Sequence, residues 1–150
     1  MKRFLLILIA VFAMSLSVSG PIRTTNQVIT VVKDGYQLLD RPTDRRLLAF
    51  RAPNGKIGFV SNSSIPVVHF LPVFEDAIVK KSTLVGVKYE GKWGAVDTSF
   101  DGDPDNRLVI PCEYDGIEII DNYRAKVLKN KKHWWILDIR DLSKITYTGN

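Results

Sequence analysis

An acidic segment at residues 101–106 has the residue types and spacing that best fit metal chemistry. It reads Asp-Gly-Asp-Pro-Asp-Asn, and alternating carboxylates in a loop can gather oxygen ligands around calcium. The calcium loop also needs glycine at its sixth position and glutamate at its twelfth, where this chain has asparagine and cysteine. We therefore expect a solvated loop between strands and no resident cofactor. The incomplete metal candidates are Asp101, Asp103 and Asp105.

Residues that could act as nucleophiles or bases are few and lie far apart in the sequence. His69 sits in the apolar stretch 67–71 and is expected to be a hydrogen-bonded core residue, whereas His133 flanks a pair of tryptophans. Two histidines at unrelated places have no metal-ligand spacing. Cys112 is the only cysteine, so it cannot form an internal disulfide, and we expect a buried, unreactive thiol. The sequence therefore predicts a protein that is not an enzyme.

A basic and aromatic stretch between residues 123 and 135 is the candidate ligand surface. Basic groups beside aromatic rings can bind single-stranded nucleic acid or anionic glycans. The same residues equally fit a charged strand face and a hairpin tip that discourage aggregation between sheet edges. We expect a solvated face, with a cell-envelope polymer as the alternative partner and no nucleic acid. The residues that would contact such a ligand are Tyr123, Arg124, Lys126 and Trp135.

Residues 1–19 have the layout of a secretory signal. Lys2 and Arg3 give a positive start, residues 4–14 are an unbroken apolar run, and the small residues that follow predict cleavage after Ser19. The run is shorter than the roughly 18 residues that span a bilayer, so no stable span is expected after cleavage. Cleavage removes two of the 21 basic residues and no acid, leaving 19 against 16, an ordinary surface charge. The mature chain, residues 20–150, is predicted to be secreted or periplasmic, with an uncleaved membrane tether as the alternative.

Turn signals and alternating polarity indicate the elements that would position these residues. Asn-Gly and Asp-Gly pairs favour the positive φ angles of tight hairpins. Within residues 92–97 alternate side chains fall on opposite faces of a strand, and no long helical pattern competes with this interpretation. We therefore predict a single compact all-β domain, an array of short antiparallel hairpins or three-stranded meanders. Four hairpins are predicted, at Asp34-Gly35, Asn54-Gly55, Glu90-Gly91 and Asn130-Lys131.

An internal repeat organises the predicted strands. Residues 71–76 resemble residues 110–115 at an offset of 39, since each segment has an aliphatic residue, a proline, an aromatic residue and a closing aspartate. Three short antiparallel strands are predicted within residues 76–97 and again within residues 115–138. Hairpin signals identify neighbouring strands but not the overall curvature. An open stack, a closed barrel and one curled sheet all fit the sequence.

The sequence Lys-Trp-Gly-Ala-Val-Asp at residues 92–97, followed by Ile-Pro-Cys-Glu-Tyr-Asp at residues 110–115, resembles the WG-repeat family. The flanking units depart from this pattern, with Ile57 at the tryptophan position, Ser61 at the aspartate position and Trp135 at the second glycine position. The resemblance implies an all-β repeat architecture but no particular activity. The repeat residues are Gly58, Pro72, Trp93, Gly94, Asp97, Pro111, Tyr114, Asp115 and Trp134.

The residues of this repeat have structural roles that need no ligand. Tryptophan can bury a large apolar area, the glycine beside it lets a neighbouring backbone approach closely, and aspartate can start a turn. Pro72 and Pro111 would fall just before the first strand of each unit, where a missing amide hydrogen costs no ladder bond. Trp135 would block a close approach, which fits a last unit with no further neighbour.

Together these features predict an exported, non-catalytic binding or assembly module whose partner is an unknown protein. The alternative is a module that binds a glycan or a cell-envelope polymer through exposed aromatic and basic residues near the C-terminus. The sequence does not distinguish between these partners, because the same residues fit either role.

Overall fold

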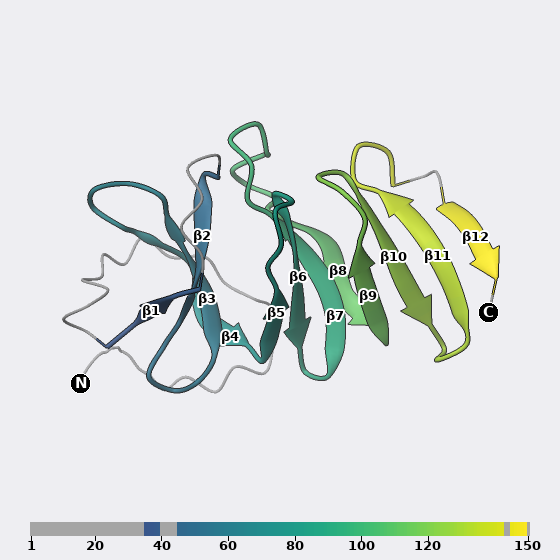
Figure 1. The fold of residues 1–150 in the computed structure, drawn as a ribbon, viewed down its shortest axis with the longest axis horizontal. Coiled ribbons are helices and arrows are strands. Elements are labelled where there is room, and N and C mark those ends of the chain that lie inside the picture. The colour runs from purple at the N-terminus through teal and green to yellow at the C-terminus, as the bar shows by residue number, and fades with distance from the viewer. Residues whose placement is uncertain (1–34, 40–44, 143–144, 150) are drawn as a thin grey trace.

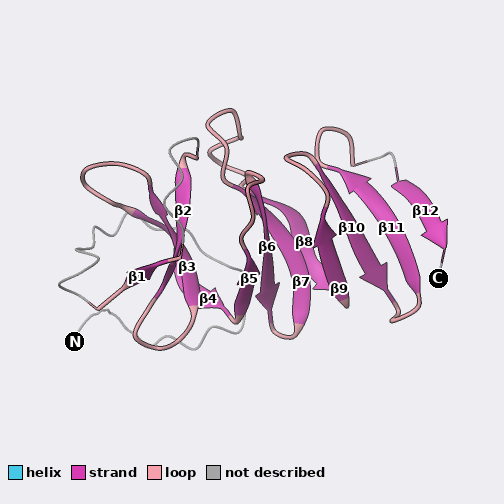
Figure 2. Cartoon of the chain, in the orientation of Figure 1, coloured by secondary structure: helices cyan, strands magenta, loops and turns pink. Residues whose placement is uncertain are grey.

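The computed structural model describes residues 35–39, 45–142 and 145–149, and in these ranges the chain forms twelve β-strands and no helix. The prediction of an all-β fold is therefore confirmed. The predicted secretory signal lies outside the described residues. The strands (Figures 1 and 2) are β1 (Gln37–Leu38), β2 (Leu47–Arg51), β3 (Ile57–Ser61), β4 (Val68–Phe74), β5 (Asp76–Ile78), β6 (Leu84–Tyr89), β7 (Lys92–Asp97), β8 (Leu108–Tyr114), β9 (Gly116–Ile119), β10 (Arg124–Lys129), β11 (His133–Asp138) and β12 (Ile145–Gly149).

The strands form three antiparallel sheets of four strands each, and within each sheet every strand pairs with the next one in the chain. We call β1–β4 sheet 1, β5–β8 sheet 2 and β9–β12 sheet 3. Figure 1 shows the three sheets in an open row, with sheet 1 at one end and sheet 3 at the other. The fold is thus an open stack, not a closed barrel or one curled sheet, and its units have four strands where three were expected.

Three of the predicted hairpins are present within the described residues. Glu90 and Gly91 have φ angles of 49° and 80° and join β6 to β7. Asn130 and Lys131, with φ angles of 56° and 55°, join β10 to β11. Gly55, at 83°, lies in the turn between β2 and β3. The fourth predicted hairpin includes Asp34, which lies outside the described residues.

An aromatic core lies between sheets 1 and 2. Phe59, Phe70 and Phe74 of sheet 1 are buried against Val85 and Val87 of sheet 2. The ring of Phe59 lies edge-on to the other two, with centroids 5.8 and 5.9 Å away. Such tilted contacts between rings add to the stabilisation that comes from apolar burial. This core fixes the first junction of the stack.

A second, aliphatic core lies between sheets 2 and 3. Leu84 and Ile110 of sheet 2 are buried against Ile117, Ala125 and Val127 of sheet 3. Sheet 2 is therefore covered on both faces, because alternate residues of each strand enter different cores. The sheets are also staggered, since β9 packs against β6 and β7, and β10 packs against β8. As a result β12 lies beyond the edge of sheet 2 that β8 forms.

Both repeat prolines lie inside a strand rather than before one. Pro72 is in β4 and Pro111 is in β8, the fourth strands of sheets 1 and 2. The predicted position was wrong because the segment around each proline pairs with the strand that precedes it. Each proline falls where the register shifts at a sheet edge, so its missing amide hydrogen still costs no ladder bond.

The strand pairing also corrects the offset of the repeat. Phe74 of β4 pairs with Ile57, and Tyr114 of β8 pairs with Trp93, which stands at the same repeat position as Ile57. Phe74 and Tyr114 are therefore counterparts, and they are 40 residues apart, not 39. Glu75, rather than Asp76, is consequently the counterpart of Asp115. Each of these two carboxylates accepts a hydrogen bond from an amide of the tight turn two strands later, at 3.2 and 2.8 Å. This correspondence identifies the charged groups at the two junctions.

Candidate functional site

The glycine of each Trp-Gly position lies against the backbone of the following strand. A Cβ added to Gly94 would lie 2.3 Å from the carbonyl oxygen of Ile110, where no real Cβ is found. Gly58 has the same relation to Phe70, with a distance of 2.5 Å. The close approach expected of these glycines is therefore confirmed. Its cause is the bulge in the fourth strand, which pushes backbone toward the third.

Trp93 and Trp134 are half-buried and each lies near a lysine ammonium group. Trp93 packs against the second core, and Nζ of Lys88 lies 5.8 Å from its ring centroid. Trp134 faces away from sheet 2, and Nζ of Lys126 lies 5.4 Å from its ring centroid. These distances fit cation–π contacts, which leave less ring surface for stacking on a sugar.

Trp135 lies on the opposite face of sheet 3 from Arg124 and Lys126, so the four residues of the candidate ligand surface do not share a face. Its ring packs against the second core and lies 5.0 Å from the ring of Tyr147 on β12. Trp135 stands at the second glycine position, yet it does not keep a fourth strand from pairing within this unit. β12 pairs with β11, and the register shifts next to Trp135.

The outward face of sheet 3 is charged where the equivalent face of sheet 2 is apolar. Ile78 and Leu84 of sheet 2 belong to the second core, whereas their counterparts in sheet 3 are Glu118 and Arg124. Lys126 stands where sheet 2 has Gly86, and its ammonium group lies 3.4 Å from the carboxylate of Glu118. This face is suited to water rather than to a fourth apolar sheet, as in the terminal unit of a repeat stack.

A shallow hollow of about 460 Å³ lies on this outward face. Arg140 lines this hollow, and its guanidinium donates two hydrogen bonds to the Asp138 carboxylate, at 2.9 and 2.5 Å. The same guanidinium lies 4.5 Å from the ring centroid of Tyr123. These bonds lower the pKa of Asp138 to about 2. Tyr123 itself is 45% exposed. The hollow is lined by Arg124, Ile136, Asp138, Arg140, Asp141 and Thr146.

The acidic segment does not gather its carboxylates. The Asp103 carboxylate accepts the amide hydrogen of Asp105 at 2.9 Å, which closes a local turn. In the described part of the chain, no three histidine, cysteine, aspartate or glutamate side chains lie where they could hold a metal ion. The geometry thus gives the three incomplete metal candidates no common centre.

Arg107, which sequence reasoning missed, organises this loop. Its side chain is only 5% exposed, and its guanidinium donates hydrogen bonds to the carbonyl oxygens of Asp97 and Ser99 at 3.1 and 2.6 Å. Asp97 in turn accepts the amide hydrogen of Ser99 at 2.9 Å, as expected for the aspartate of the repeat. The one available signal was a lone arginine between a polar loop and an apolar strand.

The histidines and the cysteine belong to separate environments. His69 is half-buried, and burial together with nearby Arg107 lowers its pKa. His133 lies on sheet 3, 3.3 Å from the Tyr147 hydroxyl. Cys112 is half-buried rather than fully buried, and burial raises the pKa of its thiol to about 11, so it is not a thiolate at neutral pH. These three residues form no nucleophile–base pair.

The second junction of the stack is closed at one end by an ion pair. Nζ of Lys92, at the start of β7, lies 2.5 Å from the carboxylate of Asp115, which stands between β8 and β9. The same carboxylate accepts the amide hydrogen of Lys131 at 2.8 Å. These bonds lower the pKa of Asp115. They tie sheet 2 directly to the hairpin of sheet 3.

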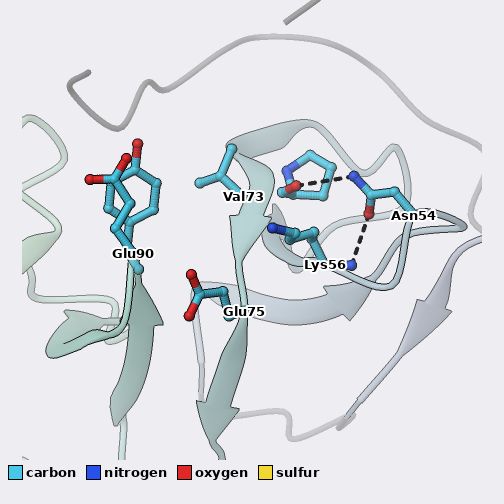
Figure 3. A pocket seen from close by; sticks show the side chains of 7 residues that line it. Asn54, Lys56, Val73, Glu75 and Glu90 are labelled. Atoms are coloured by element: carbon cyan, nitrogen blue, oxygen red, sulfur yellow. Dashed lines mark hydrogen bonds between the residues drawn. The ribbon is translucent and has the colours of Figure 1, made fainter. Parts of the chain in front are cut away.

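The first junction has equivalent groups but no equivalent ion pair. Lys56 corresponds to Lys92 and Glu75 to Asp115, yet the side chains of Lys56 and Glu75, both within the described residues, do not form a bridge. A hollow of about 230 Å³ lies there instead. Figure 3 shows Glu90 on one side of it, Lys56 and Asn54 on the other, and Val73 between them. The offset of 40 residues would have revealed Glu75 as the counterpart of Asp115 from the sequence, whereas Lys56 already aligns with Lys92 in the repeat pattern.

Comparison of the chain with protein-family models, with curated proteins and with solved structures found no match. Within the described ranges, the chain has no helix whose length and apolar character would let it cross a membrane. Two surface features therefore stand out for function: the hollow at the first junction and the charged outward face of sheet 3. Among the described residues, the charged side chains of the first form no ion pair, whereas those of the second are paired.

Proposed function

We propose that this chain is an exported, non-catalytic binding module, built from WG-like repeats, that holds a segment of a partner protein at the first sheet junction. Export is proposed from the predicted signal at residues 1–19. The repeat assignment is supported by the Trp93-Gly94 pair and by the bulge against which Gly94 packs. Measurement of the mass of the exported protein tests the predicted signal, and a product that retains Met1 would contradict its cleavage.

The observation that carries the binding proposal is the difference between two equivalent junctions. One is closed by the pair of Lys92 and Asp115, at 2.5 Å. At the other, Lys56 and Glu75 stand apart around a hollow, and Glu90 adds a second carboxylate. A charged side chain gains free energy when a partner of opposite sign approaches in a partly desolvated site. The first junction therefore offers both signs of charge to an incoming chain.

The shape of this hollow favours a polypeptide segment. Its volume of about 230 Å³ lies below the roughly 300–1,000 Å³ of sites for drug-sized molecules, so it accepts one or two side chains. A basic side chain would meet Glu75 and Glu90, and an acidic one would meet Lys56. Val73 and Pro72 add apolar lining to the hollow.

The non-catalytic part of the proposal is supported by the separation of reactive groups. His69 lies on sheet 1, Cys112 on sheet 2 and His133 on sheet 3, and the Cys112 thiol has a raised pKa. General acid–base or nucleophilic catalysis needs such groups within hydrogen-bond reach of one another.

The test is a calorimetric titration with peptides of equal length whose charge pattern is mixed, all acidic, all basic or neutral. We expect the mixed-charge peptides to bind best. Lys56→Gln should weaken binding of peptides with acidic residues, and Glu75→Gln with Glu90→Gln should weaken binding of peptides with basic residues. The expected loss is about fivefold for each, because a partly exposed charge pair contributes on the order of 1 kcal/mol.

The matched control is Lys81→Gln. Lys81 is exposed and lies between β5 and β6, at the opposite end of sheet 2 from the Glu90 turn. This change removes the same charge from the protein but not from the hollow, so peptide affinity should be unchanged. Equal affinities for the mixed and neutral peptides would contradict the proposal, and so would equal losses in Lys56→Gln and Lys81→Gln.

A cell-envelope polymer is the second candidate partner, favoured by one observation, the 45% exposure of Tyr123 beside the hollow on sheet 3. Retention on purified polysaccharide and cell-wall fractions tests it. Loss of retention in Tyr123→Ala, with an unchanged melting temperature, would favour this partner. Retention that is equal in the wild type and in Tyr123→Ala would argue against it.

A further inference from the structure

The carboxylate of Glu75 stands at a position that binds a cation at the other junction. Its counterpart Asp115 accepts a turn amide at 2.8 Å and also lies 2.5 Å from Nζ of Lys92. Glu75 accepts the equivalent turn amide, that of Gly91, at 3.2 Å, but no cationic side chain of the described residues forms an ion pair with it. The second junction therefore shows that a carboxylate held in this way takes a cationic side chain.

Glu90 brings a second carboxylate to the hollow, in a backbone conformation that its residue type does not favour. Its φ angle is 49°, in the left-handed region that glycine, asparagine and aspartate tolerate best. The counterpart in sheet 3 is Asn130, with a φ angle of 56°. The turn by itself thus favours asparagine, and it does not explain the glutamate. Residues held in sparsely populated conformations are frequent at sites that bind ligands.

Tyr89 adds an aromatic ring to the lining of the hollow. The half-buried ring packs edge-on against the fully buried Phe74, with centroids 6.4 Å apart and 75° between the planes. Burial raises the pKa of Tyr89, and the nearby Glu90 carboxylate raises it further. The counterpart position in sheet 3 is Lys129, so the repeat itself does not require an aromatic residue here.

A guanidinium group fits this set of side chains better than an ammonium group does. Guanidinium is planar, presents its N–H donors in a fork that matches carboxylate oxygens, and stacks on aromatic faces. Ammonium is a compact and strongly hydrated point charge. A cation over the face of a tyrosine ring is also attracted by the ring itself. Figure 3 shows Glu75 between Glu90 and Lys56, so the two carboxylates are neighbours along the hollow.

We propose that the hollow at the first junction takes an arginine side chain of the partner protein, with its guanidinium bound to Glu75 and Glu90 and stacked on the ring of Tyr89. This inference rests on the proposed function, because it names the residue of the partner segment that enters the hollow. The guanidinium takes the place that Lys92 fills at the second junction. An acidic residue of the same segment then meets Lys56 on the other side of the hollow.

The test is a calorimetric titration of the wild-type chain with mixed-charge peptides that differ only at one basic residue. That residue is arginine, lysine, citrulline or asymmetric dimethylarginine. Citrulline removes the charge, whereas dimethylation keeps the charge and blocks bidentate hydrogen bonding. We expect the arginine peptide to bind best, with the lysine and dimethylarginine peptides each about fivefold weaker. The citrulline peptide should bind more weakly than both.

The peptide series separates failure of this inference from failure of the proposed function. Equal affinities for arginine and lysine, both above that of a neutral peptide, would overturn the arginine assignment and leave the binding of mixed-charge segments standing. If none of the charged peptides exceeds the neutral peptide, the inference and the proposed function both fail.

Tyr89→Leu tests the aromatic ring. It should reduce the preference for arginine over lysine from about fivefold to near equality, whereas Tyr89→Phe keeps the ring and should keep the preference. The preference is a ratio of two affinities for one variant, so a loss of stability does not change it. Tyr147→Leu is the matched control, since it removes a ring that is 48% exposed on β12. A preference that survives in Tyr89→Leu, or that falls equally in Tyr147→Leu, would overturn the stacking.

Glu90→Asn separates a ligand role from a role in the turn. Asparagine suits the left-handed conformation, so this variant should keep or raise the melting temperature. It should weaken binding of the arginine peptide about fivefold, because one carboxylate is lost. A lower melting temperature with unchanged affinity would assign Glu90 to the turn and overturn the proposal.

Discussion

Gly94 lies so close to Ile110 that a Cβ at residue 94 would stand 2.3 Å from the carbonyl oxygen of residue 110. The contact joins the third strand of sheet 2 to the bulged fourth strand. Gly58 repeats it in sheet 1 against Phe70. The glycine is therefore required by the backbone of the next strand, and not by flexibility of its own strand.

Gly94→Ala should destabilise the domain by about 1–3 kcal/mol, because the methyl group meets backbone that cannot move without breaking the bulge. The matched control is Gly116→Ala, where an added Cβ would meet its nearest neighbour at an ordinary 3.4 Å. Urea unfolding of both variants measures the difference in the free energy of unfolding. Equal stabilities of the two variants would contradict the role assigned to Gly94.

Trp93→Ala should lower the free energy of unfolding by about 2–3 kcal/mol, less than the roughly 3–5 kcal/mol typical of fully buried rings. Trp93 is only half-buried, although it packs against the second core. Trp134→Ala should cost less, since that ring faces outward beside Lys126. Thermal melts of the two variants compare them. A larger cost for Trp134→Ala would reverse the assignment of the two rings.

Arg107→Met should cost about 1.5–3 kcal/mol, because it removes charge-assisted hydrogen bonds from two carbonyl oxygens. Hydrogen exchange in residues 98–106 should speed up more than exchange in the cores. Arg51→Met is the control, since Arg51 donates only an exposed hydrogen bond at 2.9 Å, to Gly55. That change should cost under about 0.5 kcal/mol. Uniform exchange changes in both variants would contradict a local role for Arg107.

Asp138 should contribute stability that depends on pH in the acid range. Its pKa in the folded protein is about 2, below the roughly 3.9 of an unfolded aspartate. A depressed pKa stabilises the fold above the unfolded value, and this contribution is lost as pH falls through about 2. The difference in melting temperature between wild type and Asp138→Asn should thus be constant at neutral pH and shrink below about pH 4.

Comparing Asp138→Asn in the wild-type and the Arg140→Gln backgrounds identifies the cause of that pH dependence. Arg140 supplies the hydrogen bonds that lower the Asp138 pKa. In an Arg140→Gln background, Asp138→Asn should change the melting temperature with a much weaker dependence on pH. A dependence that is unchanged by Arg140→Gln would assign the effect to other groups.

Local signals in the sequence predicted the strands and turns well. Gly91 and Asn130 adopt the positive φ angles that their residue types favour, and such preferences depend on only a few neighbouring atoms. Their turn neighbours Glu90 and Lys131 also have positive φ angles, which their residue types do not favour. The alternation within residues 92–97 likewise identified a strand. The error of one residue in the repeat offset arose because a bulge is defined by pairing across two strands, which a linear alignment of prolines does not contain.

The sequence pattern did not predict strand register, the folding of loops or the packing of one sheet on another. Trp135 belongs to the inner face because β10 and β11 pair in one register, and a shift by one residue would have turned it outward. Arg107 is buried because the loop between β7 and β8 folds back and brings its guanidinium to the carbonyl oxygens of Asp97 and Ser99. The open hollow at Lys56 depends on how sheets 1 and 2 meet.

The sequence by itself determined that this chain is an all-β repeat protein, because alternation and turn chemistry are properties of adjacent residues. The tertiary structure alone decided that the units have four strands, that they stack in an open row and that sheet 3 turns a charged face outward. It also decided that Lys92 meets Asp115 while Lys56 and Glu75 stay apart. The physical reason is that burial and ion pairing depend on distances between residues far apart in the chain, and packing sets those distances.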